Sequence, residues 1–374
     1  MPEVVVTAQR TESLASRTPL AISVLSGEQL RDLGADSPGT IGPRLPNVYI
    51  DQAFSGLRLT IRGISNSDTT DKGDPSAAFM LDGVYIARPA GQSGNFLDID
   101  RIEVLRGPQG TLYGRNTTAG LVNVISNAPT DRFEGALGFE TGTYHRRKVD
   151  GVINLPVNAL LSLRAAVSKL QHDPYLNNGQ GTLLRPGMDQ DDVDARLSAK
   201  LQLGQDATLV LRYDHGKAEG NNDRFVPDTN FFTGVTSGTP VYRDSTTDAR
   251  LTNSFRPPNM TPVQGWQDRV AQGWSADLRW NLGPATLYYL GGHRTLDQEL
   301  RQNYYYRVTP RIALGVINDY DGHNTQDSHE LRLATNGAGP LSAQGGLYYF
   351  SETSDTSYAF QGLQAVGLPP YYAF

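Results

Sequence analysis

The chain lacks cysteine, long apolar runs and dense basic segments, and each absence excludes a class of protein. Without cysteine among its 374 residues it has neither a disulfide framework nor a thiolate metal site. No stretch approaches the roughly 18 apolar residues that a membrane-spanning helix needs. The net charge is −6 and no dense Lys/Arg run occurs, so nucleic acid is not an expected partner.

A secretory signal is also missing from the start of the chain. Residues Met1–Val6 contain no charged segment followed by an apolar one. If the protein is exported, its signal peptide has therefore already been removed.

The low average hydrophobicity is compatible with strands that cross a membrane. Only 38% of the residues are hydrophobic, whereas glycine occurs 39 times and tyrosine 18 times. In a membrane β-barrel every second residue faces lipid, so the apolar band needs no continuous apolar run. The composition excludes a helical membrane protein and leaves a barrel open.

From about Arg132 onward, polar and apolar residues alternate. Every second residue of Ala195–Leu203 is apolar, and Trp274–Leu282 repeats this pattern with aromatic residues. A period of two is typical of strands with one apolar face. We predict about nine strands, near residues 132–142, 147–156, 160–171, 192–203, 206–217, 272–282, 285–298, 326–336 and 340–354.

The connections between these segments alternate in length. Short ones with turn residues lie at 156–159, 204–206, 283–284 and 336–340, and long ones at 172–191, 218–271 and 299–325. Outer-membrane barrels have short periplasmic turns and long extracellular loops. The predicted strands of roughly 9 to 14 residues also exceed the usual soluble strand of about 5 to 6. The pattern predicts a membrane barrel, with a soluble all-β domain as the alternative.

Residues 1 to about 130 consist of short apolar runs bounded by turn residues. Ser26, with Gln29 at the capping-box position, begins a short helix that Gly34 ends. Ser37–Pro46 is too rich in proline and glycine for a sound helix. Together these features predict a small α+β domain. The apolar runs lie at 20–25, 57–63, 78–86, 99–105 and 121–126.

Several segments of this N-terminal region match one family pattern. The most specific are Asp100–Asn116 and Ala119–Ile125, and the pattern also includes Glu3–Arg10 at the start of the chain. Together they closely resemble the plug domain of TonB-dependent outer-membrane transporters. By motif the resemblance covers the chain to about residue 155, and the rest by strand pattern alone. The other matching segments are Pro19–Val24, Leu45–Val48, Ile61–Ile64 and Phe79–Tyr85.

This resemblance implies a small α+β plug domain followed by an antiparallel transmembrane β-barrel. We expect a TonB box and N-terminal segment at 1–10, the plug domain at 11–130 and a partial, truncated barrel at 131–374. A barrel that holds such a plug has about 22 strands, of which about nine are present. An odd number of strands, with prolines before Phe374, predicts that the chain stops inside an extracellular loop.

The expected TonB box comprises Glu3, Val4, Val5, Val6, Thr7 and Ala8. Consecutive valines near a terminus form an extended strand that can pair with the edge of another sheet, where main-chain hydrogen bonds supply affinity. The resemblance assigns that pairing to the TonB protein. The alternatives are a frayed terminus or a strand of the plug's own sheet.

A second set of candidate residues belongs to the plug motifs. Four arginines of this set could latch the plug by pairing with Glu134 or Glu140 on the inner barrel wall; the alternative is that they are solvated or paired within the plug. The latch arginines are Arg62, Arg101, Arg106 and Arg115. The remaining plug-motif candidates are Gly63, Asp82, Gly83, Glu103, Gly107, Gly110, Tyr113 and Gly114. The glycines lack the Gly-Lys-Ser/Thr ending of a phosphate-binding loop, so we interpret them as turn residues.

No catalytic or metal-binding constellation is evident in the sequence. The histidines lack metal-site spacing and no nucleophile elbow is present, so we expect no enzyme, cofactor or metal. Substrate contacts stay unassigned. The histidines are His145, His172, His215, His293, His323 and His329. Aromatic residues interpreted as an interfacial girdle are Trp266, Trp274, Trp280, Tyr288, Tyr289 and residues 304–306.

By resemblance, the expected function is TonB-dependent active transport of a scarce ligand across the bacterial outer membrane. An iron–siderophore complex is the first candidate cargo. Vitamin B12, another metal chelate or an oligosaccharide are alternatives, as is a ligand-binding receptor without transport. The expected partners are TonB with its inner-membrane energising complex, outer-membrane lipid and the transported ligand.

Overall fold

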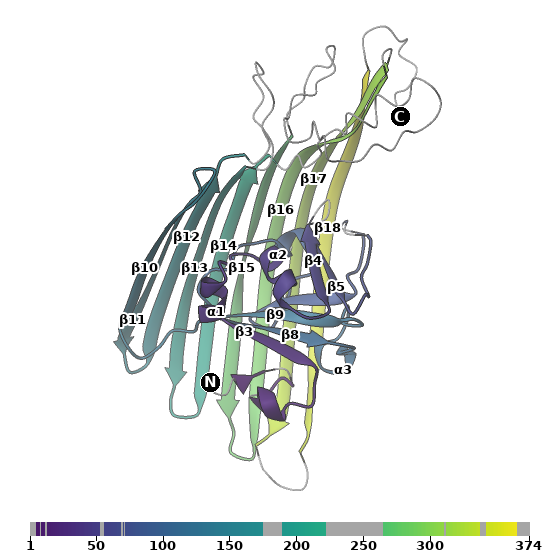
Figure 1. Ribbon diagram of the computed structural model, residues 1–374. Coiled ribbons are helices and arrows are strands. Elements are labelled where there is room, and N and C mark those ends of the chain that lie inside the picture. The colour runs from purple at the N-terminus through teal and green to yellow at the C-terminus, as the bar shows by residue number, and fades with distance from the viewer. Residues whose placement is uncertain are drawn as a thin grey trace.

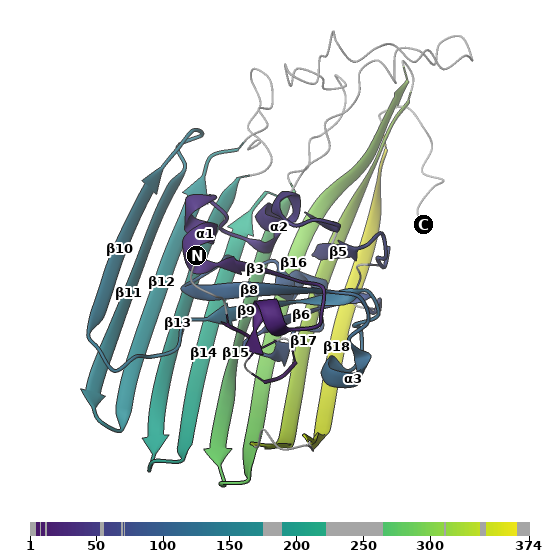
Figure 2. The same cartoon turned by 60° about the horizontal axis from the view of Figure 1, so that its bottom comes forward.

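The computed structural model describes residues 5–7, 9–11, 13–52, 56–68, 70, 72–174, 189–221, 265–309, 312–336 and 342–364. From residue 134 onward the chain forms a curved wall of strands (Figure 1). Residues 5–127, here called the N-terminal unit, lie on the concave side of this wall (Figure 2). Among the described residues, no helix combines the length and the apolar character needed to cross a membrane.

In the described part of the chain, the wall contains nine antiparallel strands, and each pairs with its neighbour in sequence. The wall is therefore an up-and-down meander, with continuous register such as that from Leu161↔Leu201 to His172↔Gln190. This confirms the predicted antiparallel sheet. The strands are β10 (Glu134–Thr141), β11 (Arg147–Asn158), β12 (Leu161–His172), β13 (Gln190–Leu203), β14 (Ala207–Gly220), β15 (Trp266–Asn281), β16 (Ala285–Thr309), β17 (Ile312–Thr335) and β18 (Gln344–Gln364).

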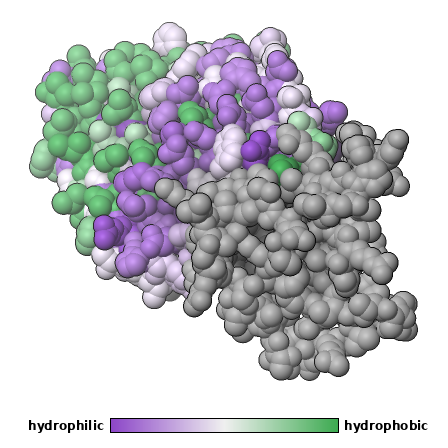
Figure 3. Space-filling model, turned by 90° about the horizontal axis from the view of Figure 1, so that it is seen from above, coloured by the Kyte–Doolittle hydropathy of each residue, from purple (hydrophilic) through white to green (hydrophobic). Residues whose placement is uncertain are grey.

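The two faces of the wall differ in polarity, as the alternation predicts. On β13, Leu197 is exposed on the outer face, whereas Arg196 and Ser198 are buried on the inner face. On β14, Tyr213 is exposed and its neighbour Arg212 is buried. Seen from above, hydrophobic residues gather along one flank and hydrophilic residues cover the adjoining central surface (Figure 3). This is the arrangement of a barrel wall with lipid outside and a polar lumen.

The strands β16 and β17 are longer than predicted. Residues 299–325 were expected to form a long loop, but β16 continues to Thr309 and β17 begins at Ile312. Pairs such as Leu300↔Tyr320 extend the ladder. The outer face of this extension is polar and carries an ion pair between Arg301 and Asp319. Above a membrane the outer face need not be apolar, so the hydropathy alternation stops although the strand continues. Similarly, β15 begins earlier than predicted and β18 ends later.

The N-terminal unit is built around a five-stranded mixed sheet. In spatial order its strands are β3 (Ile22–Ser26), β8 (Ile99–Arg106), β9 (Gly120–Ser126), β6 (Ala77–Leu81) and β7 (Val84–Tyr85). Only β6 and β9 are parallel to each other within this sheet. Two hairpins flank it: β1 (Val5–Val6) with β2 (Ser13–Leu14), and β4 (Val48–Gln52) with β5 (Leu57–Ile61). The sequence pattern did not identify β4 as a strand.

Short helical segments connect these strands. The first, α1 (Gly27–Asp32), has the predicted capping box, in which the Ser26 hydroxyl accepts the Gln29 N–H at 3.2 Å and Gly34 follows at φ +60°. The prediction for Ser37–Pro46 was wrong at its start, because Pro38 stands at the first position of a single helical turn, where proline is tolerated. The other segments are α2 (Pro38–Ile41), α3 (Gly110–Tyr113) and the 3₁₀ turns η1 (Ala15–Arg17), η2 (Gly42–Arg44) and η3 (Pro89–Gln92).

Candidate functional site

The N-terminal segment is docked against the unit in which it lies. Val5 and Val6 pair with Leu14 and Ser13, and the Val6 side chain is fully buried. The backbone N–H of Thr7 donates to the Glu103 carboxylate at 2.9 Å. Of the predicted coupling residues, Glu3, Val4 and Ala8 lie outside the described residues. Val5 and Val6 thus form a short strand within the N-terminal unit, in a two-stranded sheet of their own with β2.

Glu103 on β8 is the central acceptor of this docking. Its side chain has no exposed surface, and it accepts hydrogen bonds from the Thr7 N–H, the Thr7 hydroxyl and the Arg101 Nε. A buried carboxylate requires such donors, because its desolvation is costly when they are missing. The segment around Thr7 therefore supplies part of what makes the burial of Glu103 favourable.

Arg10 connects the same segment to the wall. Its guanidinium lies over the Tyr113 ring at 4.4 Å from the ring centre, and its Nη2 is 3.2 Å from a Glu330 carboxylate oxygen on β17. Its Nε also donates to the Leu112 carbonyl at 3.3 Å. Burial raises the pKa of Tyr113 to about 12. The ring is therefore a neutral platform for the arginine at ordinary pH.

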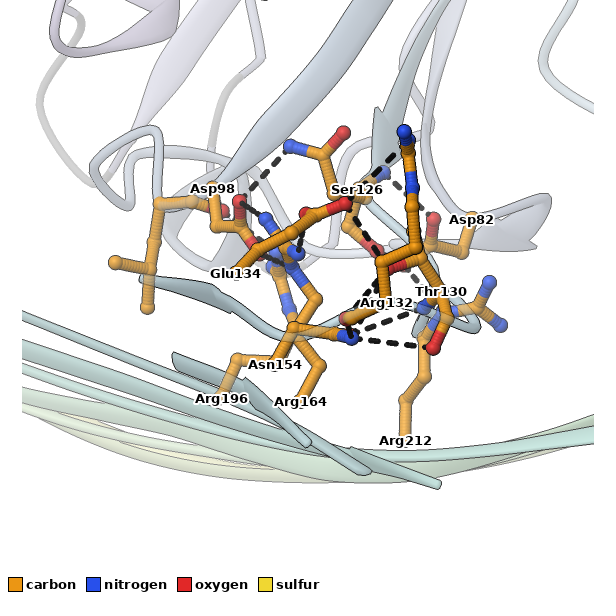
Figure 4. A network of polar contacts seen from close by, with 12 residues as sticks. Asp82, Asp98, Ser126, Thr130, Arg132, Glu134, Asn154, Arg164, Arg196 and Arg212 are labelled. Carbon is orange, nitrogen blue, oxygen red and sulfur yellow. Dashed lines mark hydrogen bonds and ion pairs between the residues drawn. The ribbon is translucent and has the colours of Figure 1, made fainter. Parts of the chain in front are cut away.

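A network of polar contacts fastens the end of the N-terminal unit to β10–β12 (Figure 4). Arg164 on β12 donates to both carboxylate oxygens of Asp98, at 2.6 and 2.7 Å, and to Glu134 at 3.2 Å. The Asn154 amide on β11 donates to the Thr130 carbonyl at 3.1 Å and its oxygen accepts the Thr130 N–H at 3.0 Å. Charged and amide groups thus connect β10, β11 and β12 to the segment from which the wall begins.

A second part of the network involves the turn between β6 and β7. Asp82 is at φ +50° and accepts the Ser126 N–H and hydroxyl, each at 2.8 Å. Its carboxylate lies 3.5 Å from Arg212 Nε on β14. Burial favours the neutral acid, but the positive charges of Arg212 and Arg196 and the Ser126 hydrogen bonds outweigh it, so the pKa of Asp82 is lowered. Arg196 on β13 also donates to the Leu97 carbonyl at 2.7 Å.

In the described residues, the four predicted latch arginines do not pair with Glu134 or Glu140. Arg101 bonds Asp100 and Glu103, Arg106 donates to the Pro46 carbonyl, and Arg115 pairs with Asp74 at 2.7 Å. Arg62 lies beside Gly107. Glu134 and Glu140 instead pair with Arg164 and Arg146 of the wall itself. The latch prediction is therefore wrong for these described partners, because each carboxylate has a nearer arginine on its own sheet.

Most ion pairs between the N-terminal unit and the wall have the charge arrangement opposite to that of the predicted latch. The N-terminal unit supplies the carboxylate and the wall the arginine in Asp98–Arg164, Asp82–Arg212 and Asp36–Arg146. The reverse order occurs in Arg10–Glu330 and Arg88–Glu352. Sequence reasoning missed these residues. The alternation alone could have shown that Arg164 and Arg212 point inward, since their flanking residues are apolar, but it could not name their partners.

The remaining predicted residues are turn elements. Gly83 and Gly107 have φ of +82° and +105°, and Gly63 and Gly114 are also left-handed, as turn glycines are. Gly110 begins the one-turn helix α3, which Tyr113 ends. Within the described part of the chain, no group of three or more His, Asp or Glu residues is placed to hold a metal.

On the side of the long connections, a cavity of about 520 Å³ separates the N-terminal unit from the wall. The α1–α2 connection and the segment after η3 form one side of it, and the ends of β10 and β12–β15 form the other. The docked segment with Arg10 lies instead near Glu330, towards the end of β17 at Thr335 and the start of β18 at Gln344. The cavity and the docked terminus are therefore on opposite sides of the N-terminal unit.

Comparison with known proteins assigns this architecture to a family. The model of the TonB-dependent receptor plug domain matches residues 15–121. The ferric yersiniabactin uptake receptor FyuA from Yersinia pestis has the same fold, with a TM-score of 0.73 at 17% identity over 94% of this chain and 51% of that one. Residues 15–121 therefore match a TonB-dependent receptor plug domain, and the wall has the fold of part of the barrel in solved receptors. The ferric-catecholate import receptor Fiu from E. coli also superposes, with a TM-score of 0.73 at 16% identity over 95% of this chain and 53% of that one.

Curated relatives support the same family. The pesticin receptor of Yersinia pestis is 28% identical over 212 residues, which is 54% of this chain and 30% of the relative. The vitamin B12 transporter BtuB of Vibrio vulnificus is 32% identical over 141 residues, 36% of this chain and 22% of the relative. The matched stretches thus cover less than a third of these relatives' length. Receptors of this family are transporters and not enzymes, and they reside in the bacterial outer membrane.

Proposed function

We propose that the protein imports a scarce ligand across the outer membrane with energy delivered by TonB. The observation that carries this proposal is the placement of two features on opposite sides of the plug. The 520 Å³ cavity lies at the strand ends that the long connections join, which is the extracellular side in outer-membrane barrels, and the docked strand Val5–Val6 lies towards the opposite strand ends, which is the periplasmic side. A ligand bound on one side can thus be coupled to a partner on the other only through the plug.

The coupling segment is proposed to be Glu3–Ala8, which includes the docked strand. Val5 and Val6 pair with only two residues of β2, so a short ladder holds them in place. A strand of a periplasmic partner could replace β2 by β-augmentation, because main-chain hydrogen bonds are equivalent from one strand to another. In this proposal residues 1–10 form the segment that couples the protein to TonB, 11–130 form the plug and 131–374 form part of the barrel.

The cargo is proposed to be an iron–siderophore complex. The solved relatives named above are a ferric yersiniabactin uptake receptor and a ferric-catecholate import receptor, and a further one is a ferripyoverdine receptor. Vitamin B12 is the second candidate, because the B12 transporter of Vibrio vulnificus has a higher identity to this chain than the pesticin receptor has, although over fewer residues. Competition between a labelled ferric chelate and unlabelled vitamin B12 separates the two.

Uptake of a labelled ferric chelate by cells that produce the full-length protein tests the coupling role. We expect Val5→Pro to abolish energy-dependent uptake while surface binding persists, because proline cannot donate to a strand ladder. The matched control is Val5→Thr, which keeps a β-branched residue and the backbone N–H and should transport normally. Normal uptake by the proline variant, or uptake that persists without TonB, would contradict the proposal. Binding without uptake in the unmodified protein would indicate a receptor that does not transport.

A further inference from the structure

The outward cavity is lined by more carboxylates than guanidinium groups. Arg146, in the connection between β10 and β11, is shared between two acids: its Nη2 is 2.6 Å from Asp36 of the plug and its Nε 2.9 Å from Glu140 of the wall. Both acids and the arginine line the cavity. One positive charge thus stands between two negative charges at this end.

Carboxylates also line the other end of the cavity. Arg269 on β15 is 7% exposed, and its Nη2 donates to the Ser93 carbonyl of the plug at 3.3 Å. Asp192 lines the cavity beside it, and the Asn95 amide of the plug donates to the carboxylates of Asp192 and Asp194 at 2.9 Å each. Asp189 adds a further carboxylate to the lining, which accepts the backbone N–H of Asn221.

The charge of the described lining follows from these groups. Asp36, Glu140, Asp189 and Asp192 stand against Arg146 and Arg269, so four carboxylates face two guanidinium groups. Glu219 also borders the cavity, but its carboxylate pairs with Lys217. Each guanidinium group of the described lining thus already has a partner within the protein, which is Asp36 with Glu140 for Arg146 and the Ser93 carbonyl for Arg269. An anionic ligand would meet more carboxylates than guanidinium groups in this lining. The like charges would repel it, because the cavity is partly shielded from water.

We propose that this cavity binds ligands that carry an ammonium group and discriminates against polyanionic chelates. The inference rests on the proposed transport function and names the charge class of its cargo. An ammonium group has three donors and no acceptor, so it matches carboxylate oxygens and the hydroxyls of Ser37 and Thr40, which also line the cavity. A ferric chelate with a free terminal amine combines this group with the proposed cargo.

Three probes that differ only in one terminal group test the proposal. They are a linear ferric trihydroxamate with a free terminal ammonium group, its neutral N-acetyl derivative and its anionic N-succinyl derivative. Their affinities are measured with the purified full-length protein by quenching of tryptophan fluorescence. We expect the ammonium form to bind at least about tenfold more tightly than the succinyl form, since one charge-assisted contact corresponds to about that factor. The ratio should shrink at high salt.

Two isosteric substitutions and a control localise the effect. Asp189→Asn and Glu140→Gln together should reduce the preference for the ammonium form about tenfold and leave the affinity of the neutral form unchanged. The control is Asp191→Asn. Asp191 stands on β13 beside Asp192 but pairs with Lys169 on the outer face, so the same loss of charge should change nothing. A purely structural role of the two acids would instead weaken all three probes equally.

The outcomes separate this inference from the transport proposal. Tighter binding of the succinyl form, equal binding of all three probes, binding of none, or equal effects of the variant on all probes would each overturn the charge preference. If the preference holds but no probe enters cells in an energy-dependent way, transport fails and the binding inference stands. If an anionic chelate is taken up efficiently and needs the energising partner, transport stands and the inference fails.

Discussion

Replacing Arg164 with methionine should loosen the plug, because this substitution leaves Asp98 buried without its main partner. The two side chains are only 10% and 6% exposed and share two hydrogen bonds of 2.6 and 2.7 Å. Asp98 would keep one side-chain donor, the Asn127 amide at 2.8 Å. Removing one member of a buried pair typically costs about 3 kcal/mol, because the other charge stays desolvated. Methionine fills a similar volume, so the cost is electrostatic and not that of a cavity.

Amide hydrogen exchange of β8 and β9 in the full-length protein measures this loss. If the plug opens as a unit, about 3 kcal/mol corresponds to roughly a 100-fold faster exchange in both strands. The double variant Asp98→Asn, Arg164→Met removes both charges and should recover most of the protection. Arg115→Met is the control, since its pair with Asp74 is about half exposed and should matter little. An exchange rate that is equally fast in the single and double variants would refute the buried-charge argument.

Three further perturbations follow from other contacts. Gly27→Ala should destabilise the plug by a few kcal/mol, because a Cβ there would lie 2.0 Å from the Ile99 carbonyl oxygen. Gly39→Ala is the control, since a Cβ there would meet nothing within 4 Å. Denaturant titration of the plug compares the two variants. The folded pKa of Asp82 lies below the unfolded value of about 3.9. Its contribution to the stability of the plug therefore persists above that pH and is lost as the pH falls through the folded pKa. Asp82→Asn should flatten the loss of exchange protection on acidification, and an unchanged pH profile would refute this. Glu330→Gln removes the ion pair with Arg10 and should increase the released fraction of the N-terminal segment about fivefold, which corresponds to roughly 1 kcal/mol. A spin label at residue 5 measures the released fraction, and Arg17→Gln at an exposed position is the control. Equal released fractions in the two variants would contradict the role of Arg10.

The wall was predictable because its determinant is local. One outward apolar residue at every second position recurs from Ala195 to Leu203, and the strand order follows because strands that are consecutive in sequence usually pair. The ends of β16 and β17 were not predictable in this way. Beyond the membrane the outer positions carry residues such as Arg301 and Asp319, and there strand pairing and not hydropathy sets the structure.

The contacts between plug and wall could not be derived from the sequence alone. Asp98 and Arg164 are 66 residues apart, and Arg88 and Glu352 are 264 apart. Many inward positions carry polar groups, so charge and alternation leave numerous possible partners for each arginine. The pairings depend on how the plug is seated against the wall. The motif arginines were conspicuous in sequence, yet the described ion pairs of Arg101 and Arg115 are made within the plug.

The buried charges between plug and wall favour one position of the plug over other positions, but they add little to the stability of that position. Forming a buried ion pair gains little net free energy, because desolvation offsets most of the attraction, but leaving either member alone is costly. Arg212 is buried and lies 3.5 Å from Asp82, and Arg196 is buried against the Leu97 carbonyl. A plug seated in another register would leave these guanidinium groups buried without partners. The correct seating is therefore specified sharply while its net stability stays modest, which suits the proposed function, in which the plug closes the barrel and is also displaced from it.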